Sequence, residues 1–110
     1  MELTIEQRNY ILAIRHLIPE TASYEQAAEE CCELAQALLK KARKYRAENY
    51  TPKTIEEINK DIQEEFTDVM LCMSVLGIKE SPDILNEKLE RWVKRNLKDE
   101  DLERILNENH

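Results

Sequence analysis

The chain has 110 residues, a formal net charge of −7, one glycine and 35% charged residues. This length suits one domain, residues 1–110, and the mixture of Glu, Lys, Leu and Ala at helical spacing predicts an all-α fold. The scarcity of glycine excludes a P-loop, and the negative charge disfavours a nucleic-acid duplex or an anionic membrane as a partner. With no signal peptide and no long apolar run, we expect a soluble, cytoplasmic protein.

Capping residues and apolar spacing predict two helices in the first half of the chain. The first occupies residues 4–18, with Thr4 as its N-cap. The second occupies residues 23–48, where Ser23 and Gln26 can form a capping box. The end of this second helix is rich in Lys and Arg, which suits the negative end of a helix dipole.

Similar signals delimit two further helices and a short amphipathic segment, at residues 54–76, 82–97 and 102–106. Thr54 and Glu57 form a capping box at the start of the first of these, and Gly77 is its expected stop. Ser81 is the expected N-cap of the next, because Pro82 favours the first helical position. We therefore expect a bundle of four to five helices.

Two pairs of acidic residues interrupt the apolar stripes of the second and third helices. Glu30 and Glu33 lie one turn apart on the second helix, and Glu65 and Asp68 lie one turn apart on the third. Apolar residues share these faces: Ala27, Leu34, Ala37, Ile58, Ile62, Val69, Cys72 and Leu76. Because buried carboxylates repel one another unless a cation compensates them, four converging acids predict a divalent metal ion. A solvated acidic helix face is the alternative interpretation.

Oxygen ligands alone suit Mg²⁺, Mn²⁺ or Ca²⁺. A ferritin-like di-iron site would need Glu-x-x-His on its helices, and neither His16 nor His110 follows such a glutamate. We therefore expect Mg²⁺, and Mn²⁺ would also fit. The three cysteines form no CxxC motif and have no nearby histidine, so we interpret them as small buried apolar residues: Cys31, Cys32 and Cys72.

The stretch from Glu29 to Glu33, followed by Glu65 and Asp68, resembles the EExxE…ExxD signature of the all-α NTP pyrophosphatases. This superfamily includes MazG-like proteins, dimeric dUTPases, dCTPases and phosphoribosyl-ATP pyrophosphatase. The surrounding residues, among them Gln26 and the hydrophobic positions after Asp68, agree with the resemblance, which covers residues 24–95.

The resemblance implies a role for each acid and for three basic residues. Glu30, Glu33, Glu65 and Asp68 would bind Mg²⁺ and act in catalysis. Glu29 would lie beside them, holding a second metal ion or orienting water. Basic residues of the helix at 82–97 would contact the substrate phosphates, although a solvated surface is the alternative for them: Lys88, Arg91 and Arg95.

The implied reaction is hydrolysis of a nucleoside triphosphate to the monophosphate and pyrophosphate, by metal-activated water attacking the α-phosphorus. Similar proteins assemble into homodimers or homotetramers, and the apolar stripes of the first and last helices fit that expectation. Two alternatives remain: a non-catalytic helical module that binds a protein partner, and a carboxylate metal-binding protein without hydrolase activity.

Overall fold

A computed structural model describes residues 2–47 and 52–109. Every regular element in this part of the chain is an α-helix, so the all-α fold is confirmed. The helices are α1 (Ile5–Leu17), α2 (Glu20–Tyr45), α3 (Ile55–Leu76), α4 (Pro82–Asn96) and α5 (Asp99–Glu108). The chain divides into two compact units, Met1–Lys79 and Glu80–His110, so that α1, α2 and α3 belong to the first and α4 and α5 to the second.

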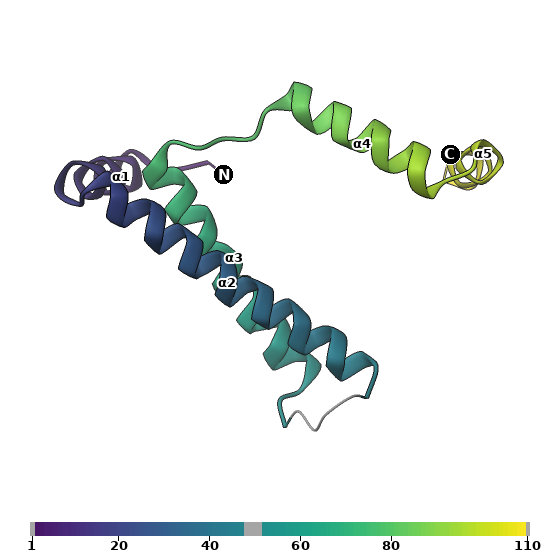
Figure 1. Ribbon diagram of the computed structural model, residues 1–110, viewed down its shortest axis with the longest axis horizontal. Helices are drawn as coiled ribbons and strands as arrows, with labels where there is room; N and C mark the ends of the chain where they lie inside the picture. The colour runs from purple at the N-terminus through teal and green to yellow at the C-terminus, as the bar shows by residue number, and fades with distance from the viewer. Residues whose placement is uncertain (1, 48–51, 110) are drawn as a thin grey trace. The chain divides into compact units, whose positions relative to one another are not determined.

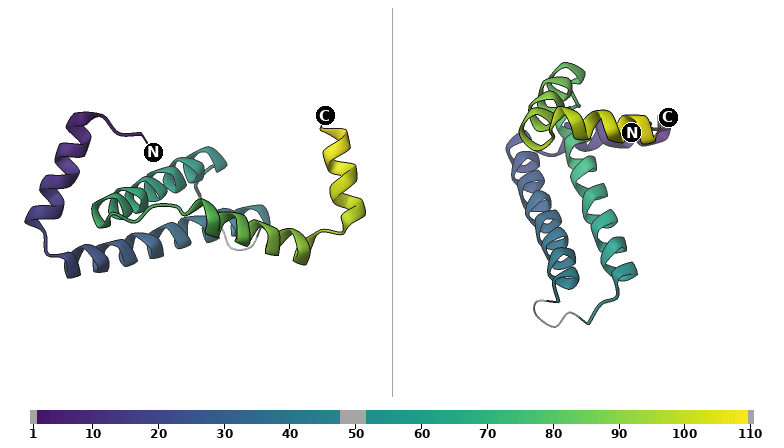
Figure 2. Two further views of the ribbon diagram at one scale, coloured as in Figure 1. Left: turned by 90° about the horizontal axis from the view of Figure 1, so that it is seen from above. Right: turned by 90° about the vertical axis from the view of Figure 1, so that its right-hand side faces the viewer.

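Helices α2 and α3 form the frame of the first unit. They lie side by side and antiparallel, as Figures 1 and 2 show. Ala27 and Ala37 of α2 and Ile58 of α3 are buried, as the apolar stripes predict, and Ile58 is only 2% exposed. The small alanine side chains allow the two helix backbones to approach each other. The position of each α2 side chain opposite α3 is therefore set by this packing.

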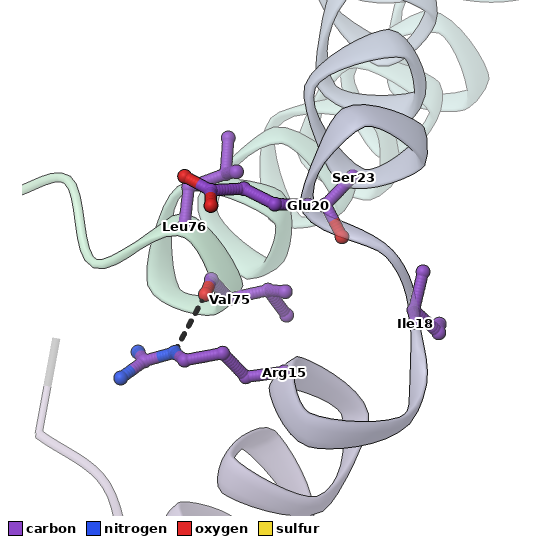
Figure 3. A pocket seen from close by; sticks show the side chains of 6 residues that line it. All are labelled: Arg15, Ile18, Glu20, Ser23, Val75 and Leu76. Atoms are coloured by element: carbon purple, nitrogen blue, oxygen red, sulfur yellow. Dashed lines mark hydrogen bonds between the residues drawn. The ribbon is translucent and has the colours of Figure 1, made fainter.

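Helix α1 is attached to the opposite end of the pair from the α2–α3 connection (Figure 1). The guanidinium group of Arg15 donates a hydrogen bond of 2.7 Å from Nε to the Val75 carbonyl (Figure 3). It donates a second one, also 2.7 Å long, from Nη2 to the Ser74 carbonyl. These carbonyls belong to the last turn of α3, where a positive charge is favourable. A cavity of about 200 Å³ lies beside this contact, lined in part by Ile18 and Glu20.

The capping predictions for α1, α3 and α4 are confirmed. Thr4 Oγ1 accepts the Gln7 N–H, and Thr54 Oγ1 accepts the Glu57 N–H, each within a complete capping box. Ser81 Oγ accepts the Ile84 N–H at the start of α4. Gly77 ends α3 in the left-handed conformation, and the Ile78 N–H returns to the Met73 carbonyl, which satisfies a carbonyl at the end of the helix.

The predicted start of the second helix is wrong. Helix α2 begins at Glu20, with Pro19 as its N-cap, so Glu20, Thr21 and Ala22 are helical residues that precede Ser23. Gln26 therefore closes no capping box, and its amide donates to Glu30 instead. Helix α2 ends at Tyr45, and the predicted end at Glu48 lies outside the described residues, as do 49–51 of the loop.

The prediction that all three cysteines are buried is also wrong. Cys31 and Cys32 are exposed, and Cys72 is half-buried. The next two residues after Glu30 turn by about 100° each around the helix, which carries them off the stripe that faces α3. Cys72 lies seven residues after the half-buried Glu65 and therefore on the same face of α3, so it is partly covered.

The second unit consists of α4 and α5. Neither helix contains a buried residue, and α4 exposes several large apolar side chains: Ile84, Leu85, Leu89 and Trp92. Helix α4 ends at Asn96, close to the predicted position. Helix α5 is longer than the short segment predicted at residues 102–106, because the acidic residues Asp99 to Asp101 form its first turn. None of the described helices is both long and apolar enough to cross a membrane.

Candidate metal centre

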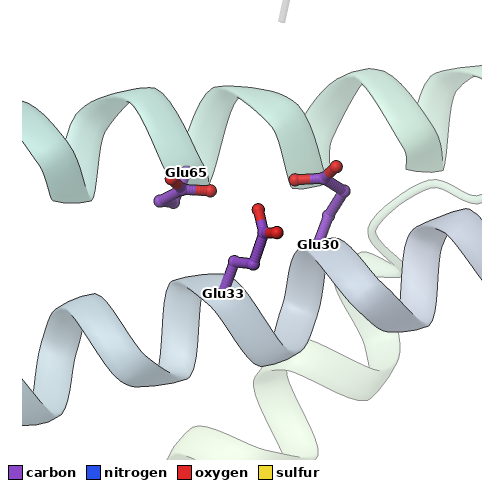
Figure 4. Close-up of side chains that lie close together, drawn as sticks. All are labelled: Glu30, Glu33 and Glu65. Carbon is purple, nitrogen blue, oxygen red and sulfur yellow. The ribbon is translucent and has the colours of Figure 1, made fainter.

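Three carboxylates meet in the space between α2 and α3. Glu30 and Glu33 project from adjacent turns of α2, and Glu65 projects toward them from α3 (Figure 4). One oxygen of each side chain can be chosen so that the three oxygens all lie within 4.8 Å of one another. The sequence predicted that these acids converge, and the antiparallel packing of the two helices brings these three together.

Two of the carboxylate oxygens in this cluster lack a hydrogen-bond partner. Glu30 and Glu65 are half-buried, whereas Glu33 is exposed. Glu30 Oε2 and Glu65 Oε2 are each enclosed by protein atoms, yet neither accepts a hydrogen bond. Enclosing a carboxylate oxygen without a hydrogen-bond donor or a cation costs free energy, because the oxygen loses its hydrogen bonds to water and forms none in return. These two atoms are therefore the strongest sign of a missing positive partner.

The electrostatics of Glu30 agree with this geometry. Loss of surrounding water raises the pKa of Glu30 above its ordinary value. Gln26 Nε2 donates to Glu30 Oε1 at 2.7 Å and opposes this shift, while the negative charges of Glu33 and Asp68 add to it. The folded chain without a cation thus disfavours the charged form of Glu30, and a bound cation would favour it.

The other two predicted acids, Glu29 and Asp68, are not members of the cluster. Asp68 is exposed and is not one of the three clustered carboxylates, but its charge raises the pKa of both Glu30 and Cys72. Glu29 is exposed on α2, one residue before Glu30. Burial is the main cause of the raised pKa of Cys72, so this thiol stays protonated near neutral pH.

The three predicted phosphate-binding residues lie on α4, in the second unit. Lys88, Arg91 and Arg95 are all exposed, and their spacing of three and four residues places them on one side of that helix. Their role remains a prediction.

Gln26 is a residue of the site that the sequence reasoning assigned to helix capping. It lies four residues before Glu30, on the same face of α2, and its amide holds one oxygen of that carboxylate. The spacing of a Gln four residues before a Glu in the middle of a helix is the signal that could have identified it. Gln26 thus orients Glu30 through one oxygen, while the other, Oε2, has no hydrogen-bond partner.

The residues present fit a hard divalent cation. All the clustered donors are carboxylate oxygens, two of them are unpartnered, and no sulfur or nitrogen atom belongs to the cluster in the described residues. Such a donor set suits Mg²⁺ or Mn²⁺. Glu30, Glu33 and Glu65 would hold the ion, and the nearby Asp68 could complete its coordination.

Comparison with known proteins gives no relative: no protein-family model, curated protein or solved structure matches this chain.

Proposed function

We propose that this chain is a MazG-like, Mg²⁺-dependent nucleoside triphosphate pyrophosphohydrolase, a hydrolase of nucleotide metabolism that acts on phosphoric anhydrides. The observation that carries the proposal is the convergence of Glu30, Glu33 and Glu65, with two enclosed oxygens that lack a partner. The resemblance of these residues and Asp68 to the EExxE…ExxD signature supplies the reaction. The substrate would be a ribo- or deoxyribonucleoside triphosphate.

In this proposal, the acids bind Mg²⁺ and water attacks the α-phosphorus. A new P–O bond forms, the α–β anhydride bond breaks, and pyrophosphate leaves with the nucleoside monophosphate as the other product. The bound metal ion would neutralise phosphate charge and lower the pKa of the attacking water. Two exposed acids are candidates to accept the proton from that water: Glu29, one residue before Glu30, and Asp68, whose charge acts on Glu30.

A MazG-like bundle completed by a second copy, as a homodimer or homotetramer, is part of the same proposal. The first unit leaves large apolar side chains exposed on α1, among them Ile5 at 79% and Leu17 at 77% exposure. Helix α4 exposes Trp92 as well. Burial of such side chains against another subunit would be favourable. We further propose a cytoplasmic protein whose ligand is the nucleotide, without nucleic-acid or membrane partners.

The test is hydrolysis of a panel of common and modified NTPs and dNTPs with Mg²⁺, with monophosphate and pyrophosphate both measured. We expect turnover that a chelator abolishes and that Glu33→Gln or Asp68→Asn lowers by roughly 100-fold or more. Glu64→Gln, an exposed acid on α3 outside the cluster, is the matched control and should retain activity. No turnover of any substrate, or full turnover in Glu33→Gln and Asp68→Asn, would falsify the proposal.

The same protein samples also distinguish two alternative functions. The exposed apolar side chains of α1 and α4 would also suit a non-catalytic module that binds a protein partner. The carboxylate cluster would also suit a metal-binding protein without hydrolase activity. Thermal stabilisation by Mg²⁺ without turnover favours the metal-binding protein, whereas the absence of both favours the interaction module.

A further inference from the structure

A triphosphate bound at the cluster needs positive charge nearby, because the acids and the net charge of −7 both repel it. The C-terminal part of α2 is the densest run of positive charge in the sequence. Together with the C-cap residue Arg46, it has five basic residues within seven positions: Lys40, Lys41, Arg43, Lys44 and Arg46. The same helix therefore carries two acids of the cluster and, further along, a concentration of cations.

Three of these cations follow the line of the acids along α2: Lys40, Lys41 and Lys44. At about 100° per residue, Lys40 lies only about 20° around the helix from Glu33, and Lys41 about 20° from Glu30. Lys40 is seven residues after Glu33, which corresponds to about 10 Å along the helix axis. Side chains on a helix lean toward its N-terminus, so both lysines lean back toward the cluster. Lys44 also lies about 20° from Glu33, but it already takes part in another interaction. Arg43 lies about 80° from Glu33 and about 140° from Glu30.

Within the part of the chain that the structure describes, no carboxylate neutralises the charge of Lys40 or Lys41. In residues 2–47 and 52–109, neither Lys40 nor Lys41 forms an ion pair with a carboxylate. Lys41 Nζ lies 5.7 Å from the centre of the Tyr45 ring, a contact that stabilises the ammonium group without cancelling its charge. Lys41 is also half-buried, and a cation in that position gains from an anionic ligand.

Three other cations of the first unit are already engaged or face elsewhere. Lys53 Nζ donates to Asp61 at 2.6 Å, and Arg15 is bound to carbonyls at the end of α3. Lys60 lies on the side of α3 away from Glu65, since five residues correspond to about 140° around a helix. Lys40 and Lys41 thus combine a position in line with the acids and, within the described residues, a charge that no carboxylate pairs.

We propose that Lys40 and Lys41 form a polyphosphate subsite that binds the β- and γ-phosphates of the substrate. This inference rests on the proposed function, because it assumes that the α-phosphate lies at the carboxylate cluster. The two ends of the triphosphate would then lie along α2, with the α-phosphorus near Glu33 and the phosphates of the leaving pyrophosphate near the lysines. Neutralisation of those phosphates also stabilises the charge that develops on the leaving group.

The test is equilibrium binding of inorganic tripolyphosphate to the full chain in the presence of Mg²⁺, measured by calorimetry. We expect the dissociation constant to rise by roughly tenfold or more in Lys40→Gln and in Lys41→Gln, because each removes a charge-assisted hydrogen bond. Lys60→Gln makes the same change of charge on α3 and should leave the dissociation constant within about twofold of the wild type. Far-UV circular dichroism and the melting temperature identify any variant that fails to fold. In that case Lys40→Arg and Lys41→Arg, which keep the charge, are used in place of the glutamine variants and should retain binding.

The outcomes separate this inference from the proposed function. Lysine-dependent tripolyphosphate binding without turnover of any nucleotide supports the subsite and overturns the hydrolase. Nucleotide turnover with unchanged KM in Lys40→Gln and Lys41→Gln overturns the subsite and leaves the hydrolase intact. Absence of tripolyphosphate binding by the wild type also overturns the subsite. A loss of binding in Lys88→Gln alone would move the phosphate contacts to α4 and would likewise overturn it.

Discussion

Removal of one carboxylate from the cluster should stabilise the metal-free protein and abolish its response to Mg²⁺. Glu65→Gln is the most informative change, since Glu65 is the α3 member of the cluster and one of its oxygens is enclosed without a partner. The replacement keeps the size of the side chain. It removes the repulsion with the two α2 acids and supplies an amide that can donate a hydrogen bond to them.

The size of the effect follows from the separation of the charges. Two unit charges 4.8 Å apart repel by about 0.9 kcal/mol even at the dielectric constant of water, and by more when they are partly enclosed. The spacing is also shorter than the Debye length of about 8 Å at physiological salt, so screening is incomplete. Because Glu33 is exposed and salt screens roughly half of this repulsion, the repulsion between Glu33 and Glu65 corresponds to a rise of about 2–4 °C in Tm for a unit of this size.

The assay is thermal unfolding of wild type and Glu65→Gln, each with a chelator and with excess Mg²⁺. In wild type, Mg²⁺ at 100 times its dissociation constant should add about 2.7 kcal/mol to the free energy of unfolding. In Glu65→Gln, the Tm in chelator should rise and the Mg²⁺ response should be lost, while Glu64→Gln should behave as the wild type. A lower Tm of Glu65→Gln in chelator, or an undiminished Mg²⁺ response, would refute the reasoning.

Three further predictions concern the pH dependence, the end of α3 and the core. The pKa of Glu30 is raised in the folded, metal-free protein. At pH values between the ordinary pKa of a glutamate and this raised pKa, the folded protein therefore binds more protons than the unfolded chain, and the free energy of unfolding should fall as the pH rises. Urea unfolding in chelator between about pH 4 and 8 should show a shallower fall in Glu30→Gln, and an equal fall in both proteins would contradict the assignment. Gly77→Ala should lower the free energy of unfolding, measured in urea, by about 1–2 kcal/mol, because the residue has a φ of 73°. The cost comes from the backbone alone, because the added Cβ would lie at an ordinary contact distance of 3.8 Å from Arg15 Nη2. An unchanged midpoint would show that the left-handed turn is not required. Ile58→Ala should cost about 2–5 kcal/mol because this side chain is 2% exposed, whereas Ile5→Ala, at 79% exposed, is the control; similar losses in both would place the core elsewhere.

Much of the helical framework was predictable because its signals are local. Thr4, Thr54 and Ser81 cap helices through atoms three residues away, and Gly77 ends α3 through its own backbone conformation. The start of α2 was not predictable by the same rule. Ser23 and Gln26 have the spacing of a capping box, but the helix continues upstream to Glu20, and Gln26 bonds to Glu30. A residue that fits a capping pattern can thus form a different hydrogen bond in the folded chain.

The sequence by itself determined that acids lie on the apolar stripes of two helices, since helical periodicity alone places Glu30 with Glu33 and Glu65 with Asp68. Only the tertiary structure decided which acids meet. The antiparallel packing of α2 on α3, set by Ala27, Ala37 and Ile58, brings Glu65 to the α2 pair and leaves Asp68 exposed at its edge. Distances across a helix interface depend on how the two helices are aligned along their axes. That alignment arises from side-chain packing between residues far apart in the chain, which the spacing within either helix does not encode.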